Sequence, residues 1–231
     1  MNKKSLAIII FSFLIINCFI TFFIVEKTQA TGNRYYVSDK PNIYNYGTAE
    51  YPFNNIQHAI DIASNGDTIY VFGGEYNETL VIDKEVTLVG SIEGGDSIIS
   101  YIPSHKYTIQ ITADNVNLTG FNINNTLDSI TSYISGALIY VTGNSVIIQN
   151  NLITNCTNGW AIYLDSADNN LIKNNNINNM YGGIYATSSK TNDIVNNSIS
   201  NCTNHILKLL SSDYNTIYNN DLIYGKYGIY E

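Results

Sequence analysis

The chain has 231 residues, of which 45% are hydrophobic, and a formal net charge of −8 at pH 7. This hydrophobic fraction excludes a disordered chain, because disordered chains lack the apolar residues that form a core. The acidic charge, with no cluster of lysines or arginines in the sequence, excludes nucleic acid as a partner, since nucleic acids are bound by basic patches.

Residues 1–30 have the features of a targeting segment. Lys3 and Lys4 precede an apolar run over residues 6–25, and residues 28–30 read Thr-Gln-Ala, a small-residue cleavage pattern. The run is longer than the apolar part of a typical signal peptide and long enough to span a bilayer. The segment is therefore either a cleaved signal peptide or a retained membrane anchor, and only an anchor would hold the chain at a membrane. Both alternatives place the rest of the chain outside the cytoplasm, secreted or at the cell surface.

Residues 31–66 predict an N-terminal cap made of a strand and a helix. The strand starts at Arg34, and apolar residues at helical spacing follow Pro52 until the stop signal Gly66. An amphipathic helix over residues 53–64 would cover the apolar interior at one end of the fold and block the addition of strands there.

Residues 67–231 carry the repeat Ile-x-Asn-Asn-x-Ile at a nearly constant period. Its clearest copies begin at Ile148, Ile172, Ile194 and Ile217, which lie 24, 22 and 23 residues apart. A second short segment in each copy alternates apolar and polar residues, the pattern of a half-buried strand. Paired asparagines and glycines would interrupt a helical solenoid of this period. Short strands that stack on the same strands one coil later predict an all-β parallel β-helix.

The last copy of the repeat has no cap after it. Glu231 falls in the middle of a coil, just after the pair Ile229 and Tyr230. The coil array is therefore expected to be incomplete at its C-terminal end. Either the chain is a fragment of a longer protein, or a partner covers the open coil.

One asparagine of each pair has a predicted structural role. Asparagine is the non-glycine residue that best tolerates the left-handed backbone conformation of a sharp turn between two strands. Stacked coils would also let the side-chain amides hydrogen-bond along the axis as a ladder. The predicted ladder consists of Asn150, Asn174, Asn196 and Asn219.

The segment before the coils carries a family resemblance. Residues 51–60 read Tyr-Pro-Phe-Asn-Asn-Ile-Gln-His-Ala-Ile, followed by Gly-Asp-Thr-Ile-Tyr-Val from Gly66 and Gly-Gly-Glu-Tyr from Gly73. With the Asn-rich repeats, these motifs resemble the pectin-lyase-like right-handed β-helix superfamily, in particular its NosD-like repeat group, over residues 34–231. The resemblance implies a right-handed parallel β-helix. For function it implies a choice among polysaccharide lyases, glycoside hydrolases, epimerases, adhesins and a periplasmic protein of copper-enzyme maturation.

The coils show no clear set of catalytic residues. A lyase or epimerase needs a base, usually Arg or Lys in that superfamily, and often clustered carboxylates that bind Ca²⁺. The only arginine precedes the coils, and the coil carboxylates share no register position, although Asp165 and Asp168 could flank one cation. The histidines His58, His105 and His205 are scattered along the chain. We therefore expect a non-catalytic protein without a cofactor, with a lyase or epimerase as the alternative.

Three sulfur-containing residues, Cys156, Met180 and Cys202, each lie three residues after the second apolar position of a repeat. They would form a column on successive coils. Soft sulfur ligands suit Cu(I), so a copper-handling protein is a second alternative. Core filling is the stronger explanation, because Cys and Met are common core residues. The two cysteines would lie two coils apart, about 9.6 Å, which is too far for a disulfide.

The best functional signal is a row of outward side chains in the second strand of five successive coils. The row consists of Tyr140, Tyr163, Tyr185, Lys208 and Tyr230. Aromatic faces at strand spacing can stack on sugar rings, and tyrosine hydroxyls can add hydrogen bonds. An inert aromatic ladder is the alternative, because tyrosine favours strands. The sequence thus predicts an exported, non-catalytic surface module that binds a polysaccharide or a cell-envelope protein through this row.

Overall fold

The structure is a computed structural model and describes residues 32–40, 43–100, 106–125 and 136–231. The predicted targeting segment, residues 1–30, lies outside the described residues. Within the described ranges, no helix has the length and apolarity that crossing a bilayer requires.

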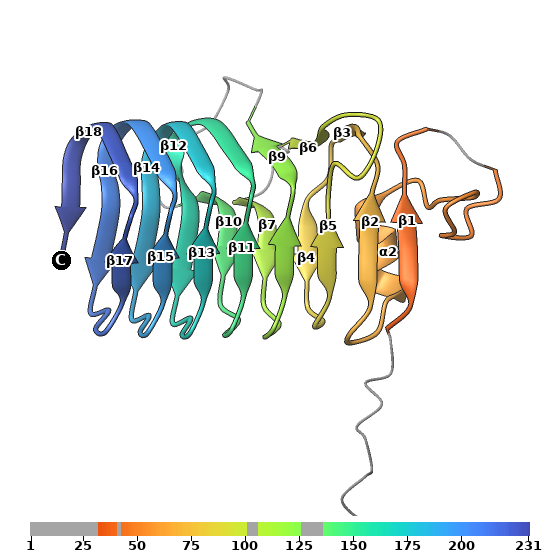
Figure 1. The fold of residues 1–231 in the computed structure, drawn as a ribbon, viewed down its shortest axis with the longest axis horizontal. Coiled ribbons are helices and arrows are strands. Elements are labelled where there is room, and N and C mark those ends of the chain that lie inside the picture. Colours follow the sequence, from red (N-terminus) through yellow and green to blue (C-terminus); the bar gives the residue numbers. More distant parts are fainter. Residues whose placement is uncertain (1–31, 41–42, 101–105, 126–135) are drawn as a thin grey trace, which may run out of the picture. The chain divides into compact units, whose positions relative to one another are not determined.

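The described chain forms a β-solenoid whose coils follow one another in sequence order (Figure 1). One parallel sheet of eight strands makes the first face. Its strands are β1 (Arg34–Val37), β2 (Thr68–Val71), β5 (Thr87–Val89), β8 (Asn117–Thr119), β11 (Ile147–Gln149), β13 (Leu171–Lys173), β15 (Asp193–Val195) and β17 (Thr216–Tyr218). Neighbouring strands are one coil apart, so that Ile148 pairs with Ile172. The predicted parallel β-helix is confirmed.

The remaining strands form a second parallel sheet that makes the other two faces. In the N-terminal coils each face has its own short strands. They are β3 (Gly74–Tyr76), β6 (Ser97–Ser100) and β9 (Phe121–Asn124) on one face, and β4 (Leu80–Ile82), β7 (Tyr107–Ile111) and β10 (Ala137–Val141) on the other. In the later coils one long strand continues around the corner between the two faces. These strands are β12 (Leu152–Asp165), β14 (Asn176–Thr187), β16 (Ser198–Leu210) and β18 (Asp221–Tyr230).

Columns of isoleucine fill the interior of the solenoid. Ile153, Ile177 and Ile199 occupy paired positions on β12, β14 and β16, and each side chain is completely buried. Burying one such side chain stabilises the fold by about 1.5–3 kcal/mol. The repeated isoleucines therefore hold successive coils in register.

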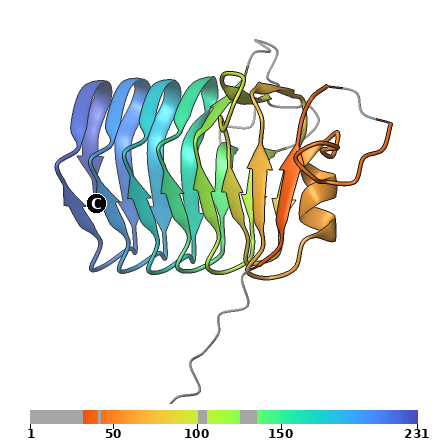
Figure 2. The ribbon, with the colours of Figure 1, turned by 45° about the vertical axis from the view of Figure 1, so that its right-hand side comes forward.

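The N-terminal cap contains one helix, α2 (Ile56–Ile62), which is shorter than the predicted helix over residues 53–64. The Asn55 side chain accepts a hydrogen bond from the backbone N–H of His58 (2.9 Å), so the helix begins after Asn55. Phe53 lies outside the helix and bridges to β1 instead. The helix packs against β1, β2 and β4 at one end of the solenoid (Figure 2).

Charged side chains from the following coil hold both ends of α2. The Glu78 carboxylate accepts hydrogen bonds from the backbone N–H groups of Ile56 and Gln57 at 2.9 Å each. Lys84 Nζ donates to three carbonyls at the C-terminal end of the helix, at 2.6 to 3.1 Å. Each charge faces the helix end whose partial charge is opposite, which is the stabilising arrangement.

The first asparagine of each repeat pair makes the predicted turn. Asn150, Asn174, Asn196 and Asn219 have φ values of 56, 55, 55 and 54°, within the left-handed region. Their side chains are exposed. The predicted ladder through these four amides is therefore wrong, because the turn directs them to solvent.

The second asparagine of each pair forms the ladder instead. These residues are Asn151, Asn175, Asn197 and Asn220. The Asn151 backbone N–H and its side-chain Nδ2 both donate to Asn175 Oδ1, at 3.0 and 3.1 Å. Asn175 makes the same two bonds to Asn197, and Asn197 to Asn220. Asn151, Asn175 and Asn197 are almost completely buried, so the ladder satisfies polar groups that water does not reach.

Candidate functional site

The predicted outward residues form one row across the face of the solenoid that contains β4, β7 and β10. Tyr140 of β10 pairs with Tyr163 of β12, which pairs with Tyr185 of β14. Lys208 of β16 and Tyr230 of β18 continue the row. The structure thus brings together all five residues, and ligand binding by this row stays a prediction.

The tyrosine rings of this row lie against one another. Tyr163 and Tyr185 stack with their ring centroids 4.6 Å apart and 24° between the ring planes. Tyr140 stacks in the same way on Tyr107 of β7, with centroids 4.1 Å apart. Stacked rings cover one another's faces, so most of the row presents ring edges and hydroxyls. A sugar ring therefore cannot stack on the faces that the Tyr107–Tyr140 and Tyr163–Tyr185 pairs cover.

Lys208 interrupts the row between Tyr185 and Tyr230. Its Nζ lies 5.2 Å from the Tyr185 ring centroid and 5.8 Å from that of Tyr230. A cation–π contact at an exposed site is worth about 0.5–1 kcal/mol, little enough for a ligand to displace it. Movement of this flexible side chain would uncover the Tyr185 ring.

A pocket of about 300 Å³ opens beside Lys208. We call it the aromatic pocket. Its lining residues are Trp160, Tyr163, Tyr181, Tyr185, Asn204, His205 and Lys208. Concave sites of this size with an aromatic lining and a few polar groups are typical of small-ligand binding. The sequence predicted three of these residues and missed the other four, which lie at or next to the corner between the two faces.

The aromatic pocket exists because successive coils have corners of different length. β12 has three residues between Cys156 and Trp160, whereas β14 has only Tyr181 between the paired positions Met180 and Gly182. The corner of β16 is again one residue longer than that of β14. The short corner of β14 therefore lies between two longer ones and leaves a depression at Tyr181.

Gly182 makes room for the Trp160 ring above this short corner. A Cβ atom at position 182 would lie 2.4 Å from two ring atoms of Trp160, closer than non-bonded atoms approach. The indole is 5% exposed and lies 5.0 Å from the Tyr185 ring, centroid to centroid. A glycine paired with a tryptophan one coil earlier is the sequence signal that could have identified this pocket.

Polar groups complete the C-terminal side of the aromatic pocket. The Asn204 amide donates to the Tyr181 hydroxyl, and His205 stacks on Tyr227 with centroids 4.7 Å apart. Among the described residues, Asn204 Oδ1 and His205 Nδ1 are buried without a hydrogen-bond partner. Burial lowers the pKa of His205, and the nearby charges of Lys208 and Lys226 lower it further. His205 is therefore neutral at pH 7, and Lys208 is the cation of the pocket.

The phenols of Tyr163 and Tyr140 stay protonated at neutral pH. Burial raises the pKa of Tyr163 to about 12, and the negative charge of Asp165 adds to the shift. Burial also raises the pKa of Tyr140, whose hydroxyl donates a hydrogen bond to Asp165 Oδ2 at 2.7 Å. The Tyr163 hydroxyl can therefore donate a hydrogen bond to a ligand, whereas the single proton of the Tyr140 hydroxyl is already donated to Asp165. Neither phenol serves as a base.

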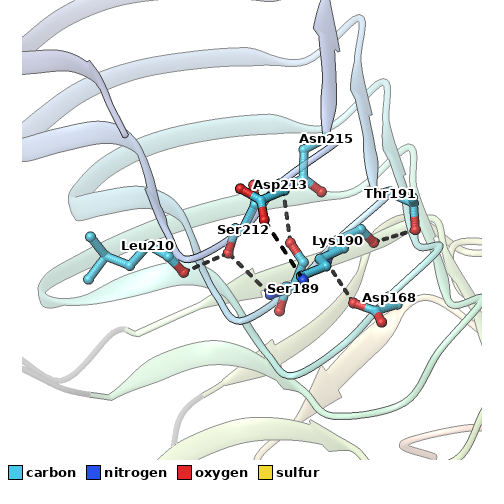
Figure 3. A network of polar contacts seen from close by, with 8 residues as sticks. All are labelled: Asp168, Ser189, Lys190, Thr191, Leu210, Ser212, Asp213 and Asn215. Carbon is cyan, nitrogen blue, oxygen red and sulfur yellow. Dashed lines mark hydrogen bonds and ion pairs between the residues drawn. The ribbon is translucent and has the colours of Figure 1, made fainter.

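The carboxylates that could have flanked a cation are engaged separately. Asp165 accepts the Tyr140 bond, whereas Asp168 Oδ1 accepts a hydrogen bond from the Lys190 backbone N–H at 2.6 Å. Figure 3 shows Asp168 within a network of polar contacts between successive coils. In the same network Lys190 Nζ lies 3.8 Å from Asp213 Oδ2. In the described part of the chain, no three His, Cys, Asp or Glu side chains are grouped to hold a metal ion.

The sulfur residues form the predicted column. Cys156, Met180 and Cys202 are paired on β12, β14 and β16, and all three are buried. Both thiols are free. Burial raises the pKa of Cys156, and it raises that of Cys202 to about 11. Both are therefore neutral thiols at pH 7, as expected of core residues.

The parallel coils, the helical cap and the asparagine ladder together define a pectin-lyase-like parallel β-helix. Residues 26–230 match the family described as periplasmic copper-binding protein (NosD). The chain belongs to this family. It is also 36% identical to YwoF of Bacillus subtilis (strain 168) over 69 residues, which cover 28% of this chain and 15% of YwoF.

Solved structures with the same fold include proteins that act on carbohydrates. A pectin methylesterase in complex with a hexasaccharide superimposes with a TM-score of 0.56 at 18% identity, over 85% of this chain and 67% of its own. A rhamnogalacturonan lyase gives 0.50 at 16% identity, over 87% and 63%. XylC, solved with xylose, gives 0.51 at 12% identity, over 85% and 66%. At these identities the similarity shows the fold alone.

Proposed function

We propose that this protein is an exported, non-catalytic module that binds a polysaccharide at the aromatic pocket. The observation that carries the proposal is the pocket itself, where Trp160 and Tyr185 adjoin the displaceable cation Lys208. Aromatic rings stack on the C–H faces of sugars, while hydroxyls, amides and a lysine bind sugar oxygens. Export is supported by the periplasmic description of the family and by the apolar run in residues 1–30.

The absence of a catalytic role is supported by the charges around the pocket. Its lining, as far as the described residues form it, contains no carboxylate, and its histidine is neutral at pH 7. A glycosidase needs a pair of carboxylates on either side of the scissile bond. Lys208 contacts aromatic rings, which favours a role in binding over a role as a base.

Replacing Lys208 with alanine is expected to lower affinity for oligogalacturonate by about tenfold, as expected for a charge-assisted hydrogen bond of about 1.5 kcal/mol. Isothermal titration calorimetry with tri- and tetragalacturonate, and with xylo- and cello-oligosaccharides, measures this effect. Lys173→Ala is the control, because Lys173 occupies an outward strand position on another face. Absence of binding to every oligosaccharide of the panel would refute the proposal.

A second candidate function is Cu(I) binding by Cys156, Met180 and Cys202. The observation that favours it is the sulfur column on three adjacent coils, together with the name of the family. Thiolate and thioether sulfur fit Cu(I) in kind. Because both thiols have raised pKa values, metal binding would release protons and would strengthen as pH rises.

Cu(I) retention against a chromophoric chelator tests this second candidate. The candidate predicts that the folded protein retains one Cu(I), with greater retention at pH 8 than at pH 6. It also predicts that Cys156→Ser combined with Cys202→Ser loses the ion. Equal retention by the double variant would exclude the sulfur column as the site.

A further inference from the structure

A second pocket lies around the corner from the aromatic pocket and is built from different chemistry. It encloses about 510 Å³, and we call it the amide pocket. Its lining residues are Asn125, Asn155, Thr157, Asn179, Asn201 and Thr203, with Met180 beneath them. Among the residues that the structure describes, no charged or aromatic side chain lines it. Its lining therefore offers amide and hydroxyl groups that can both donate and accept hydrogen bonds.

Three of these asparagines stand in a row along the corner. Asn155, Asn179 and Asn201 have φ values of 62, 56 and 53°, so each turns the chain and projects its amide outward. Asn179 Nδ2 donates to Asn155 Oδ1 (3.4 Å), and Asn201 Nδ2 donates to Asn178 Oδ1 (3.1 Å). These bonds use only part of the capacity of each amide, which has two donors and two acceptor lone pairs.

Tyr181 separates the amide pocket from the aromatic pocket. It follows Met180 as Thr157 follows Cys156 and Thr203 follows Cys202, so the three residues hold equivalent places in successive coils. The Tyr181 ring packs edge-on against Trp160, with centroids 6.0 Å apart. The Tyr181 side chain, whose place in the row is between the two threonines, therefore points toward the aromatic pocket.

The lining residues of the two pockets are near neighbours along the same strands. On β14 the amide pocket ends at Met180 and the aromatic pocket begins at Tyr181. On β16 the corresponding neighbours are Thr203 and Asn204. The two pockets therefore adjoin each other along the strand direction.

We infer that the two pockets are adjacent subsites of one saccharide site that runs around the corner, parallel to the strands and transverse to the solenoid axis. One unit stacks in the aromatic pocket beside Lys208, and the next unit hydrogen-bonds to the row of asparagines and threonines. This inference rests on the proposed function, since it assigns a second subsite and a direction to the same ligand. The ligand class is an oligosaccharide of at least two units, with free hydroxyls on the unit in the amide pocket.

The test uses glycine substitutions that remove amides without changing the backbone. Asn155→Gly combined with Asn201→Gly removes two amides from the pocket, and glycine accepts the positive φ at both positions. Asn174→Gly combined with Asn219→Gly is the matched control, because these asparagines have the same conformation and exposed side chains at another corner. Calorimetry with mono-, di- and trigalacturonate, and with xylose, xylobiose and xylotriose, measures affinity against ligand length.

The double variant at the amide pocket is expected to bind trisaccharide about tenfold more weakly, the effect of losing one or two hydrogen bonds, and to bind monosaccharide as the unaltered protein does. The control variant should bind both ligands normally. Equal affinity for mono- and trisaccharide, or an unchanged trisaccharide affinity in the amide-pocket variant, would overturn the inference. If Lys208→Ala still weakens binding in that case, the proposed function stands without a second subsite. If no saccharide binds at all, the proposed function itself fails.

Discussion

Replacing Asn175 with alanine is expected to destabilise the protein by about 3 kcal/mol or more, because several buried polar groups lose their partners at once. Asn175 Oδ1 accepts two hydrogen bonds from Asn151, and its Nδ2 donates to Ile148 O and to Asn197 Oδ1. Asn151 and Asn175 are each 2% exposed, so water cannot replace these bonds. Urea unfolding followed by circular dichroism gives the difference in unfolding free energy.

The neighbouring residue provides the control for this prediction. Asn174→Ala should cost only about 1 kcal/mol, because the Asn174 side chain is exposed and the loss is limited to the lower tolerance of alanine for positive φ. Asn174→Gly should be nearly neutral. A larger loss at Asn174 than at Asn175 would contradict the ladder seen in the structure and restore the ladder predicted from the sequence.

Asn175→Asp separates the donor from the acceptor function of this side chain. The carboxylate keeps the acceptor for Asn151 but faces Ile148 O and Asn197 Oδ1 without a donor. Folding would therefore favour the protonated acid and raise its pKa above the unfolded value. The variant should be most stable at low pH and should lose stability as pH rises through that folded pKa.

The fold could be predicted because the same pattern of residues recurs in successive coils. Each isoleucine of the repeat lies on its counterpart one coil later, so a period in the sequence becomes a column in the core. The cap helix was located from apolar spacing, but its start was not. That start is set by the hydrogen bond of Asn55 and by the Glu78 carboxylate, which comes from another coil.

The ladder was misplaced by one residue because the repeat itself does not distinguish its two asparagines. Both are asparagine in all four clear copies, and both fit a turn by composition. What distinguishes them is that positive φ at the first asparagine directs its side chain outward and the next side chain inward. That alternation follows from the backbone geometry of the turn, which the order of residues in the repeat does not specify.

The row of tyrosines was predictable in position but not in orientation. The alternation of apolar and aromatic residues placed Tyr163 and Tyr185 on one outward row. Whether their rings face solvent or one another depends on side-chain torsions and neighbours, and here they stack at 4.6 Å. The aromatic pocket also depends on the unequal lengths of the corners in successive coils. The repeat spacing of 24 and then 22 residues hinted at this difference but gave no indication of its consequence.

Replacing Gly182 with alanine is expected to disturb the aromatic pocket by displacing the Trp160 ring. The new Cβ would lie 2.4 Å from the Trp160 ring, so the indole must move out of its place. Overpacking of this kind costs about 1–3 kcal/mol of stability. The displaced ring should also weaken oligosaccharide binding by about tenfold, equivalent to roughly 1.4 kcal/mol.

Trp160 is the only tryptophan of the chain, so its fluorescence reports this change directly. The ring is 5% exposed, and its displacement into water should shift the emission to longer wavelength. Gly228→Ala is the matched control, because a Cβ at position 228 would meet nothing within 4 Å. Unchanged emission and unchanged binding in Gly182→Ala would show that the position of Trp160 does not depend on Gly182.

A double-variant cycle determines whether the tryptophan and the glycine act as one unit. Trp160→Leu removes the ring that Gly182 accommodates, so adding Gly182→Ala to it should cost little further stability. Independent residues would instead show additive losses in unfolding free energy. Coupling is expected because neither coil builds the pocket alone. The longer corner of β12 brings the indole forward, and the short corner of β14 provides the space that it occupies. A pocket formed in this way depends on a difference between two neighbouring repeats, and a consensus sequence of the repeat does not contain that difference.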